Sequence, residues 1–448
     1  MRDLILLAVL AFVAGLTTRS AIIGIMTWIW VSLMSPQREV YGFLGGGFQI
    51  NLYVALFAVM CWLASRERKL FPFNGVSLGL VLFGIWAAIS TSVALAPDYS
   101  TPLFVRTLKT LILVLGVITV ANTPARIQAT VWALVLSVGY YGIRGGGFVM
   151  LTGGSHKVFG PEGSMIGDNN LLGLALVTLL PLWNYLRTTS GAKITRLACA
   201  GAMVVTTLAI LGTYSRGALV ALVVLFLLWA IRSRWAVVLL FVGVIAGVTA
   251  PVTLPAVMPK AWMERMNSMQ NVDKDASFAG RIAAWKTSVA IARARPLTGG
   301  GFASTEVQDV ITRYAPPDGL RTGLAAHSIY FQILGDHGVV GFLLYFGTIG
   351  AALLNTITVP RLARGRPDLY WSNELARMIQ LSIFAFLVGG AALSAAYYDL
   401  YLIVFGLSAV LVDYVRREVR GLNKARVPTW RADKVQEGAG ATSGRQAS

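Results

Sequence analysis

Long apolar runs are the feature that most constrains how this chain folds. As helices rising about 1.5 Å per residue, such runs are long enough to cross most or all of a hydrocarbon core about 30 Å thick. They lie near residues 49–64, 76–95, 103–121, 127–143, 169–187, 197–213, 216–232, 235–251, 328–356, 375–394 and 398–416. The sequence therefore predicts an all-α polytopic membrane protein.

Residues 1–35 decide the total number of spans. They hold two further short apolar runs, which Thr17-Thr18-Arg19-Ser20 interrupts. They form either one broken crossing with a cytoplasmic N-terminus, which gives about 12 transmembrane helices, or two short crossings, which gives about 13; we favour the first. Met1–Leu16 has a basic start but no small-residue cleavage site followed by a soluble domain. We therefore interpret it as a retained membrane segment and not as a signal peptide.

Composition supports a membrane protein and argues against a nucleic-acid partner. Of the 448 residues, 56% are apolar and 13% are charged, whereas a soluble domain has about 25% charged residues. The net charge of +18 comes from basic residues that form short clusters between apolar runs. The positive-inside rule places such clusters in cytoplasmic loops. We expect the chain to contact membrane lipids and no nucleic acid.

The loops alternate in character along the chain. Basic loops such as Ser65–Phe73 and Arg187–Arg196 are typical of the cytoplasmic side, and loops poorer in Lys and Arg, such as Ala94–Pro102, of the periplasmic side. This alternation places the loop of residues 252–326 in the periplasm. We predict transmembrane helices over 1–251, a large, mainly helical periplasmic loop over 252–326, C-terminal transmembrane helices over 327–416, and a cytoplasmic tail over 417–448 that is disordered at its end.

Three basic side chains are candidates for a site at the periplasmic face. Arg216 starts a span after almost no loop, so it is held at the membrane boundary, where it serves either a functional site or contact with lipid headgroups. Arg281 lies near the start of an amphipathic helix expected over Ala279–Ala294. A helix from His327 to Asn355 would be about 43 Å long, so His327 is expected at its outer end, in or above the membrane interface.

The residue types of this group suit one kind of ligand. Guanidinium groups grip phosphate oxygens bidentately and keep their charge, and a histidine near its neutral form can take a proton from a hydroxyl. Two arginines and a histidine on one membrane face therefore fit a di-anionic phosphate ligand. Cys61 and Cys199 lie in or beside apolar runs without ligand-like spacing, so we expect no metal, no other cofactor and no disulfide framework.

Several segments resemble the O-antigen ligase family. They are Tyr214-Ser215-Arg216-Gly217 at the start of a span, Gly280-Arg281-Ile282-Ala283-Ala284-Trp285 in the long loop, and the run from His327 to Gly341 that leads into the next span. The segments Trp28–Pro36, Ile166–Asn170 and Arg295–Phe302 are similar to a subgroup, the O-glycosylation ligases associated with exosortase systems.

The resemblance implies a GT-C-like helical membrane fold and a metal-independent glycosyltransferase in the bacterial inner membrane. It implies transfer of a glycan from undecaprenyl pyrophosphate to a hydroxyl of lipid A-core at the periplasmic face, in lipopolysaccharide biosynthesis. Arg216 and Arg281 would bind the pyrophosphate, and His327 would act as general base or hold the phosphate. Asp168 is a second candidate base, ranked lower because an Asp at a helix start more often caps the helix. The further residues expected to bind substrate are Asp168, Asn169, Tyr214, Tyr330 and Arg321.

Alternative functions use the same pattern. An O-antigen polymerase or a protein O-oligosaccharyltransferase would use the same donor with another acceptor. A transporter of lipid-linked sugars would perform no chemistry, but it should carry charged residues deep in several helices to line a path. Here the ionisable residues gather at one face, which favours an enzyme.

Overall fold

The computed structural model describes residues 2–40, 44, 49–67, 69–231, 259–260, 262–263, 276–315 and 324–421, and every regular element in these ranges is helical. The apolar run expected over 235–251, Arg321 and the tail beyond 421 lie outside the described residues, as does much of the loop expected over 252–326.

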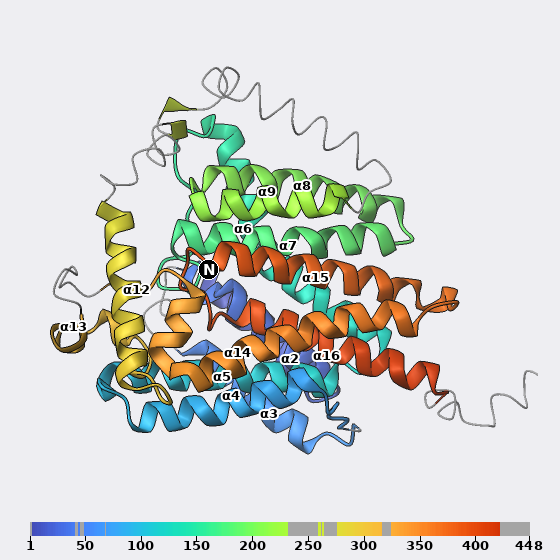
Figure 1. Cartoon of the computed structure of the whole chain (residues 1–448). Helices are drawn as coiled ribbons and strands as arrows, with labels where there is room; N and C mark the ends of the chain where they lie inside the picture. Colours follow the sequence, from blue (N-terminus) through green and yellow to red (C-terminus); the bar gives the residue numbers. More distant parts are fainter. Residues whose placement is uncertain are drawn as a thin grey trace, which may run out of the picture.

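Most helices share one axis direction and form a bundle (Figure 1). These are α1 (Arg2–Thr17), α2 (Ala21–Met34), α3 (Ile50–Ala64), α4 (Gly75–Ser92), α5 (Pro97–Val120), α6 (Pro124–Thr152), α7 (Asn169–Thr189), α8 (Lys193–Gly212), α9 (Arg216–Ile231), α14 (Ile329–Leu362), α15 (Tyr370–Gly390) and α16 (Asp399–Val419). Helix α12 (Ala276–Ala294) runs across one end of this bundle, and α13 (Gln308–Tyr314) lies outside it. We call this end the α12 end and the opposite end the far end.

Length and composition of the helices agree with a polytopic membrane protein. Within the described ranges, 6 helices are long and apolar enough to cross a membrane, namely α4, α5, α6, α7, α8 and α14. The outer helices also expose large apolar side chains such as Leu63, Ile85, Val204 and Phe226. Lipid is the surrounding that suits exposed apolar faces of this extent.

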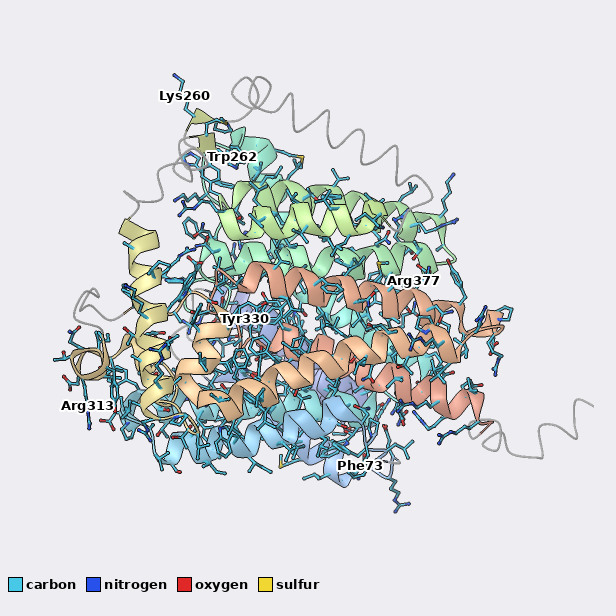
Figure 2. All side chains as sticks on the ribbon, viewed as in Figure 1. Phe73, Lys260, Trp262, Arg313, Tyr330 and Arg377 are labelled. Atoms are coloured by element: carbon cyan, nitrogen blue, oxygen red, sulfur yellow. The ribbon has the colours of Figure 1, made fainter. Side chains whose placement is uncertain are left out.

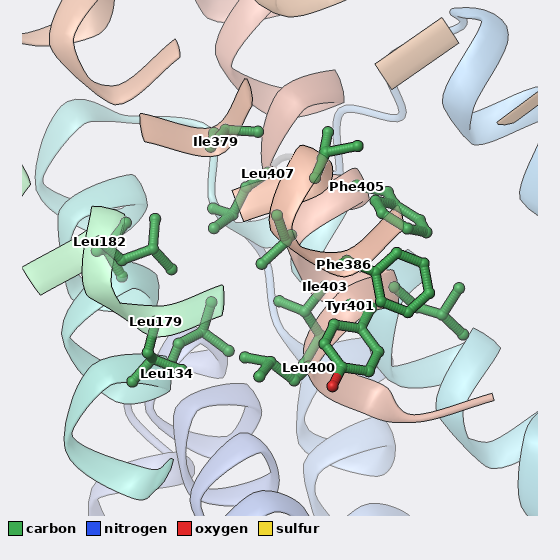
Figure 3. Packing of buried hydrophobic residues seen from close by; sticks show 14 of the residues in the cluster. Leu134, Leu179, Leu182, Ile379, Phe386, Leu400, Tyr401, Ile403, Phe405 and Leu407 are labelled. Atoms are coloured by element: carbon green, nitrogen blue, oxygen red, sulfur yellow. The ribbon is translucent and has the colours of Figure 1, made fainter. Parts of the chain in front are cut away.

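The centre of the bundle is built around α7 and α16, which are buried along most of their length. Figure 3 shows Leu179 and Leu182 of α7 close to Leu400 and Leu407 of α16 in one packed cluster. Near-continuous apolar sequence explains this position, because a helix that is apolar on all sides is stable only when other helices or lipid surround it.

The N-terminal segment differs from the single broken crossing favoured by the sequence. Helices α1 and α2 fold back on each other, since Leu6 and Val31 share one apolar cluster and the Asp3 carboxylate accepts the Leu44 N–H at 3.1 Å. The interruption between them forms a turn, in which Glu67 accepts the Ala21 N–H at 3.2 Å. The Glu67 carboxylate thus provides a hydrogen-bond partner for the turn at the far end of the bundle. The segment therefore forms two short antiparallel helices and not one long broken helix.

Helix α14 is broken at Gly338, where the backbone adopts φ 67° and ψ −167°. The Gly-rich segment after α12 supplies hydrogen bonds that the break removes. The N–H groups of Gly300 and Gly301 donate to the carbonyls of Gly335 and Asp336, both at 2.9 Å. A Cβ on Gly299, whose φ is +63°, would lie 2.6 Å from the Gly338 nitrogen, so only glycine fits this approach. The break holds the first part of α14 against α12.

Candidate active site

His327 lies immediately before α14 in a strained backbone conformation. Its φ is +45°, in the left-handed region, and its N–H donates to Ser394 Oγ at 2.7 Å. A non-glycine residue in this region costs about 1–3 kcal/mol, and such residues cluster at functional sites because the surrounding structure must enforce them. The contact with Ser394, which follows α15, is one such constraint. The side chain is half-buried at the α12 end.

Trp285 joins α12 to the segment that carries His327. Its Nε1–H donates to the Ala326 carbonyl at 2.7 Å, and its ring stacks on Phe331 with centroids 4.9 Å apart. Arg281 lies about one helical turn before Trp285, on the same helix and half-buried. The tryptophan therefore positions Arg281 relative to His327.

Arg281 and Asp168 both act on His327 through their charges. Burial lowers the pKa of the His327 imidazole, the Arg281 guanidinium lowers it further, and the Asp168 carboxylate opposes both effects. The imidazole is therefore neutral at pH 7, because its ordinary pKa of about 6.5 is already below that value. The structure thus brings together three residues that are far apart in sequence.

Asp168 also caps α7, as the sequence indicated for an Asp at a helix start. Its carboxylate accepts the N–H groups of Asn170 at 2.8 Å and Leu171 at 3.2 Å. The next residue, Asn169, donates from its side chain to the Thr213 carbonyl at 2.7 Å. The start of α7 is therefore tied to the corner between α8 and α9.

That corner carries Arg216, the first residue of α9. Tyr214 has a φ of +56°, and its buried hydroxyl donates to the Gly154 carbonyl at 2.5 Å. A Cβ added to Gly217 would lie 3.5 Å from the side chain of Ala392. Arg216 therefore starts its helix beside the segment in which Ser394 holds His327. The hydroxyl of Tyr214 therefore fixes the corner.

Tyr330 packs within the bundle. Its hydroxyl donates to the Leu387 carbonyl at 3.1 Å, and its ring stacks on Phe346 with centroids 5.0 Å apart. Figure 2 shows it among the helices near the α12 end, whereas Arg313 on α13 lies at the periphery. Tyr330 therefore contributes to packing between helices. Arg321 lies outside the described residues.

Ser394 and the Trp285–Ala326 bond were not identified from the sequence. A serine between two spans and a carbonyl in a loop carry no pattern that marks them. Other polar groups near the break in α14 pair with each other inside the bundle. Tyr397 donates to Asp336 Oδ2 at 2.8 Å, and His337 Nδ1 lies 3.0 Å from Ser90 Oγ. In the part of the chain that the structure describes, no group of three or more His, Cys, Asp or Glu side chains is arranged to hold a metal ion.

Comparison with protein families identifies the family that part of the chain matches. Residues 201–346 match the family model described as O-antigen ligase. Residues 201–346 therefore form an O-antigen ligase domain. The match includes Arg216, Arg281 and His327. It gives the chain a ligase- or polymerase-type function in O-antigen biosynthesis, with lipid-linked glycan and acceptor as substrates.

A second family model matches the N-terminal part of the chain, so residues of the candidate site lie in two matched regions. Residues 1–191 match a family of unknown function, and this region contributes Asp168. A search of the curated proteins found no match. The group around His327 therefore combines residues from the O-antigen ligase match with a carboxylate from the preceding region.

Proposed function

We propose that the chain is an O-antigen ligase-type membrane glycosyltransferase. It transfers a glycan from undecaprenyl pyrophosphate to a hydroxyl of lipid A-core at the periplasmic face of the bacterial inner membrane. The observation that carries this proposal is the grouping of His327, Arg281 and Asp168 at one end of the bundle, with Arg216 on the adjoining corner.

The arginines bind the donor. Breaking the bond between the sugar C1 and the pyrophosphate oxygen leaves negative charge on undecaprenyl pyrophosphate. Fixed guanidinium groups at a partly dehydrated site favour that charge, and their planar forks match phosphate oxygens. Arg216 and Arg281 fill this role, so the reaction proceeds without a metal ion.

His327 acts as general base on the acceptor. The acceptor hydroxyl oxygen forms a bond to C1 while its proton passes to the imidazole, and the pyrophosphate leaves. The lowered pKa of His327 keeps it in the neutral form that accepts a proton. The Asp168 carboxylate stabilises the imidazolium that forms, since its charge raises the pKa of His327.

The choice of acceptor tests the proposed function. Purified enzyme is given undecaprenyl-pyrophosphate-linked glycan together with lipid A-core, a second lipid-linked glycan or a peptide. We expect transfer to lipid A-core, seen as a product of higher mass on gels and by mass spectrometry. A lengthened lipid-linked glycan would identify a polymerase, and a glycopeptide would identify a protein O-oligosaccharyltransferase. Movement of donor across proteoliposomes without transfer to any acceptor would identify a transporter.

The pH dependence of transfer tests the role of Asp168. The neutral imidazole is the active form, so kcat/KM falls as pH drops through the pKa of His327. Asp168→Asn removes the charge that raises this pKa but keeps a good helix cap. The fall in kcat/KM should therefore move to lower pH in the variant, as measured by initial rates across a pH series.

Asp98→Asn is the matched control, because Asp98 also lies at the start of a helix, in the first turn of α5. Its pH profile should equal that of the unmodified protein. An Asp168→Asn profile that is unchanged, or that shifts to higher pH, would contradict the proposed interaction with His327.

A further inference from the structure

A polar pocket opens in the region that matches the family of unknown function. Its volume is about 330 Å³, and it is lined by Trp28, Ser32, Ser35, Gln37, Arg38, Asn51, Arg106, Lys109, Thr110, Leu113, Gly163, Ser164, Met165 and Asp399. All of these except Asp399 fall within residues 1–191. The pocket is separate from the residues assigned above to donor binding and proton transfer.

Positive charge dominates this pocket. Arg38, Arg106 and Lys109 face one carboxylate, Asp399, which accepts hydrogen bonds from the Ser32 and Thr110 hydroxyls. The three basic side chains make no ion pair or hydrogen bond with any other residue that the structure describes. The pocket therefore holds an excess of cations without their own counter-ions.

The positions of two of these cations are unusual for a structural role. Arg106 and Lys109 lie within α5, one of the helices long and apolar enough to cross a membrane. Ionisable residues inside such helices are costly and mark functional sites by default. The wall opposite Arg38 is also shaped to it, because a Cβ on Gly163 would lie 3.0 Å from the guanidinium carbon.

Two uncharged side chains add a second requirement for a ligand of this pocket. The side-chain oxygens of Gln37 and Asn51 are buried and have no hydrogen-bond partner among the described residues. A buried acceptor without a partner destabilises the structure, and hydroxyl groups are donors that would satisfy it. A ligand that fits the whole lining carries both an anionic group and hydroxyls.

We propose that this pocket binds an acidic sugar residue of a glycan substrate. Its carboxylate lies against Arg38, Arg106 and Lys109, and its hydroxyls donate to Gln37 and Asn51. The identity of the sugar as part of a transferred glycan rests on the proposed function, whereas binding itself does not.

The pocket is joined to the group around His327 by a short piece of chain. Met165 lines the pocket, and Asp168 acts on His327. Three residues of backbone span at most about 11 Å. A glycan held at His327 therefore has a subsite for its acidic residue within reach of a few sugar units.

Direct binding to the purified full chain tests the proposal. Saturation-transfer NMR, with probe titrations, compares glucuronate with neutral glucose and with inorganic phosphate. We expect glucuronate to bind more tightly than either. Arg106→Gln combined with Lys109→Gln should weaken glucuronate binding by about tenfold or more, since a hydrogen bond to a charged group contributes about 1.5–3 kcal/mol.

Lys193→Gln combined with Arg196→Gln is the matched control. It removes the same two residue types, at the same spacing, from the exposed start of α8, and should leave glucuronate binding unchanged. Arg38→Gln, at an exposed position on the 3-10 helix Pro36–Arg38, repeats the test if the first double variant fails to fold.

Four results would overturn the proposal. Three of them are equal binding of glucuronate and glucose, equal effects of the two double variants, and phosphate binding as tight as that of glucuronate. Loss of glucuronate binding in phosphatidylglycerol nanodiscs, but not in phosphatidylcholine nanodiscs, would assign the pocket to lipid headgroups instead. Glycan transfer is measured separately, so a chain that binds glucuronate without transferring glycan would reject only the proposed function.

Discussion

Replacing His327 should reduce the rate of glycan transfer by about 10²–10⁴-fold, the contribution typical of a general base. His327→Asn is the sharper variant, because asparagine tolerates the left-handed backbone that His327 adopts at φ +45°. It lacks a group that accepts a proton near neutral pH. Single-turnover transfer from undecaprenyl-pyrophosphate-linked glycan to lipid A-core measures the chemical step.

His156→Asn provides the control for this substitution, since His156 is exposed in the loop between α6 and α7. It should transfer glycan at the normal rate. If His327→Asn kept full activity while folding normally, the imidazole would not be the base. If only donor affinity fell, with the chemical step intact, His327 would instead hold the phosphate.

Arg281→Lys should lower kcat/KM by about 10–100-fold, although the positive charge is kept. Lysine cannot make the paired hydrogen bonds of a guanidinium to phosphate, and a hydrogen bond to a charged group contributes about 1.5–3 kcal/mol. Steady-state transfer at varied donor concentration measures the loss.

The same substitution at Arg293 is the comparison, because Arg293 is exposed on the same helix. Arg293→Lys should behave as the unmodified protein. A near-normal kcat/KM for Arg281→Lys would show that Arg281 contributes general charge attraction and not a bidentate grip.

Much of the fold could be predicted because its strongest signals are local. Apolar runs indicated most of the helices, and the amphipathic pattern over 279–294 corresponds to α12. The break in α14 could not be predicted, because Gly338 is one glycine among several in an apolar run and its backbone partners lie in a distant loop. The N-terminal hairpin depends on Glu67, which binds the turn from outside it.

The candidate site could also be predicted only in part. Arg216, Arg281 and His327 could be singled out because they lie on the side of the membrane predicted to be poorer in Lys and Arg, and because they carry a family pattern. Ser394 could not, since its role depends on the backbone N–H of a residue 67 positions away. Arg106 and Lys109 fell inside an expected span, and only packing shows that they face a pocket.

The hydrogen bond from His327 to Ser394 has a consequence for the order of assembly. Chains are made from the N-terminus, so Asp168, Arg216 and Arg281 are all synthesised before the serine that fixes His327. The left-handed turn at His327 lacks this support until α15 has been inserted and the chain beyond it has returned to the α12 end. On the proposed function, a nascent chain therefore carries the residues that would bind pyrophosphate before the residue that would act as base is positioned. The backbone of His327 therefore gains this support only after α15, when most of the described helices have already been made.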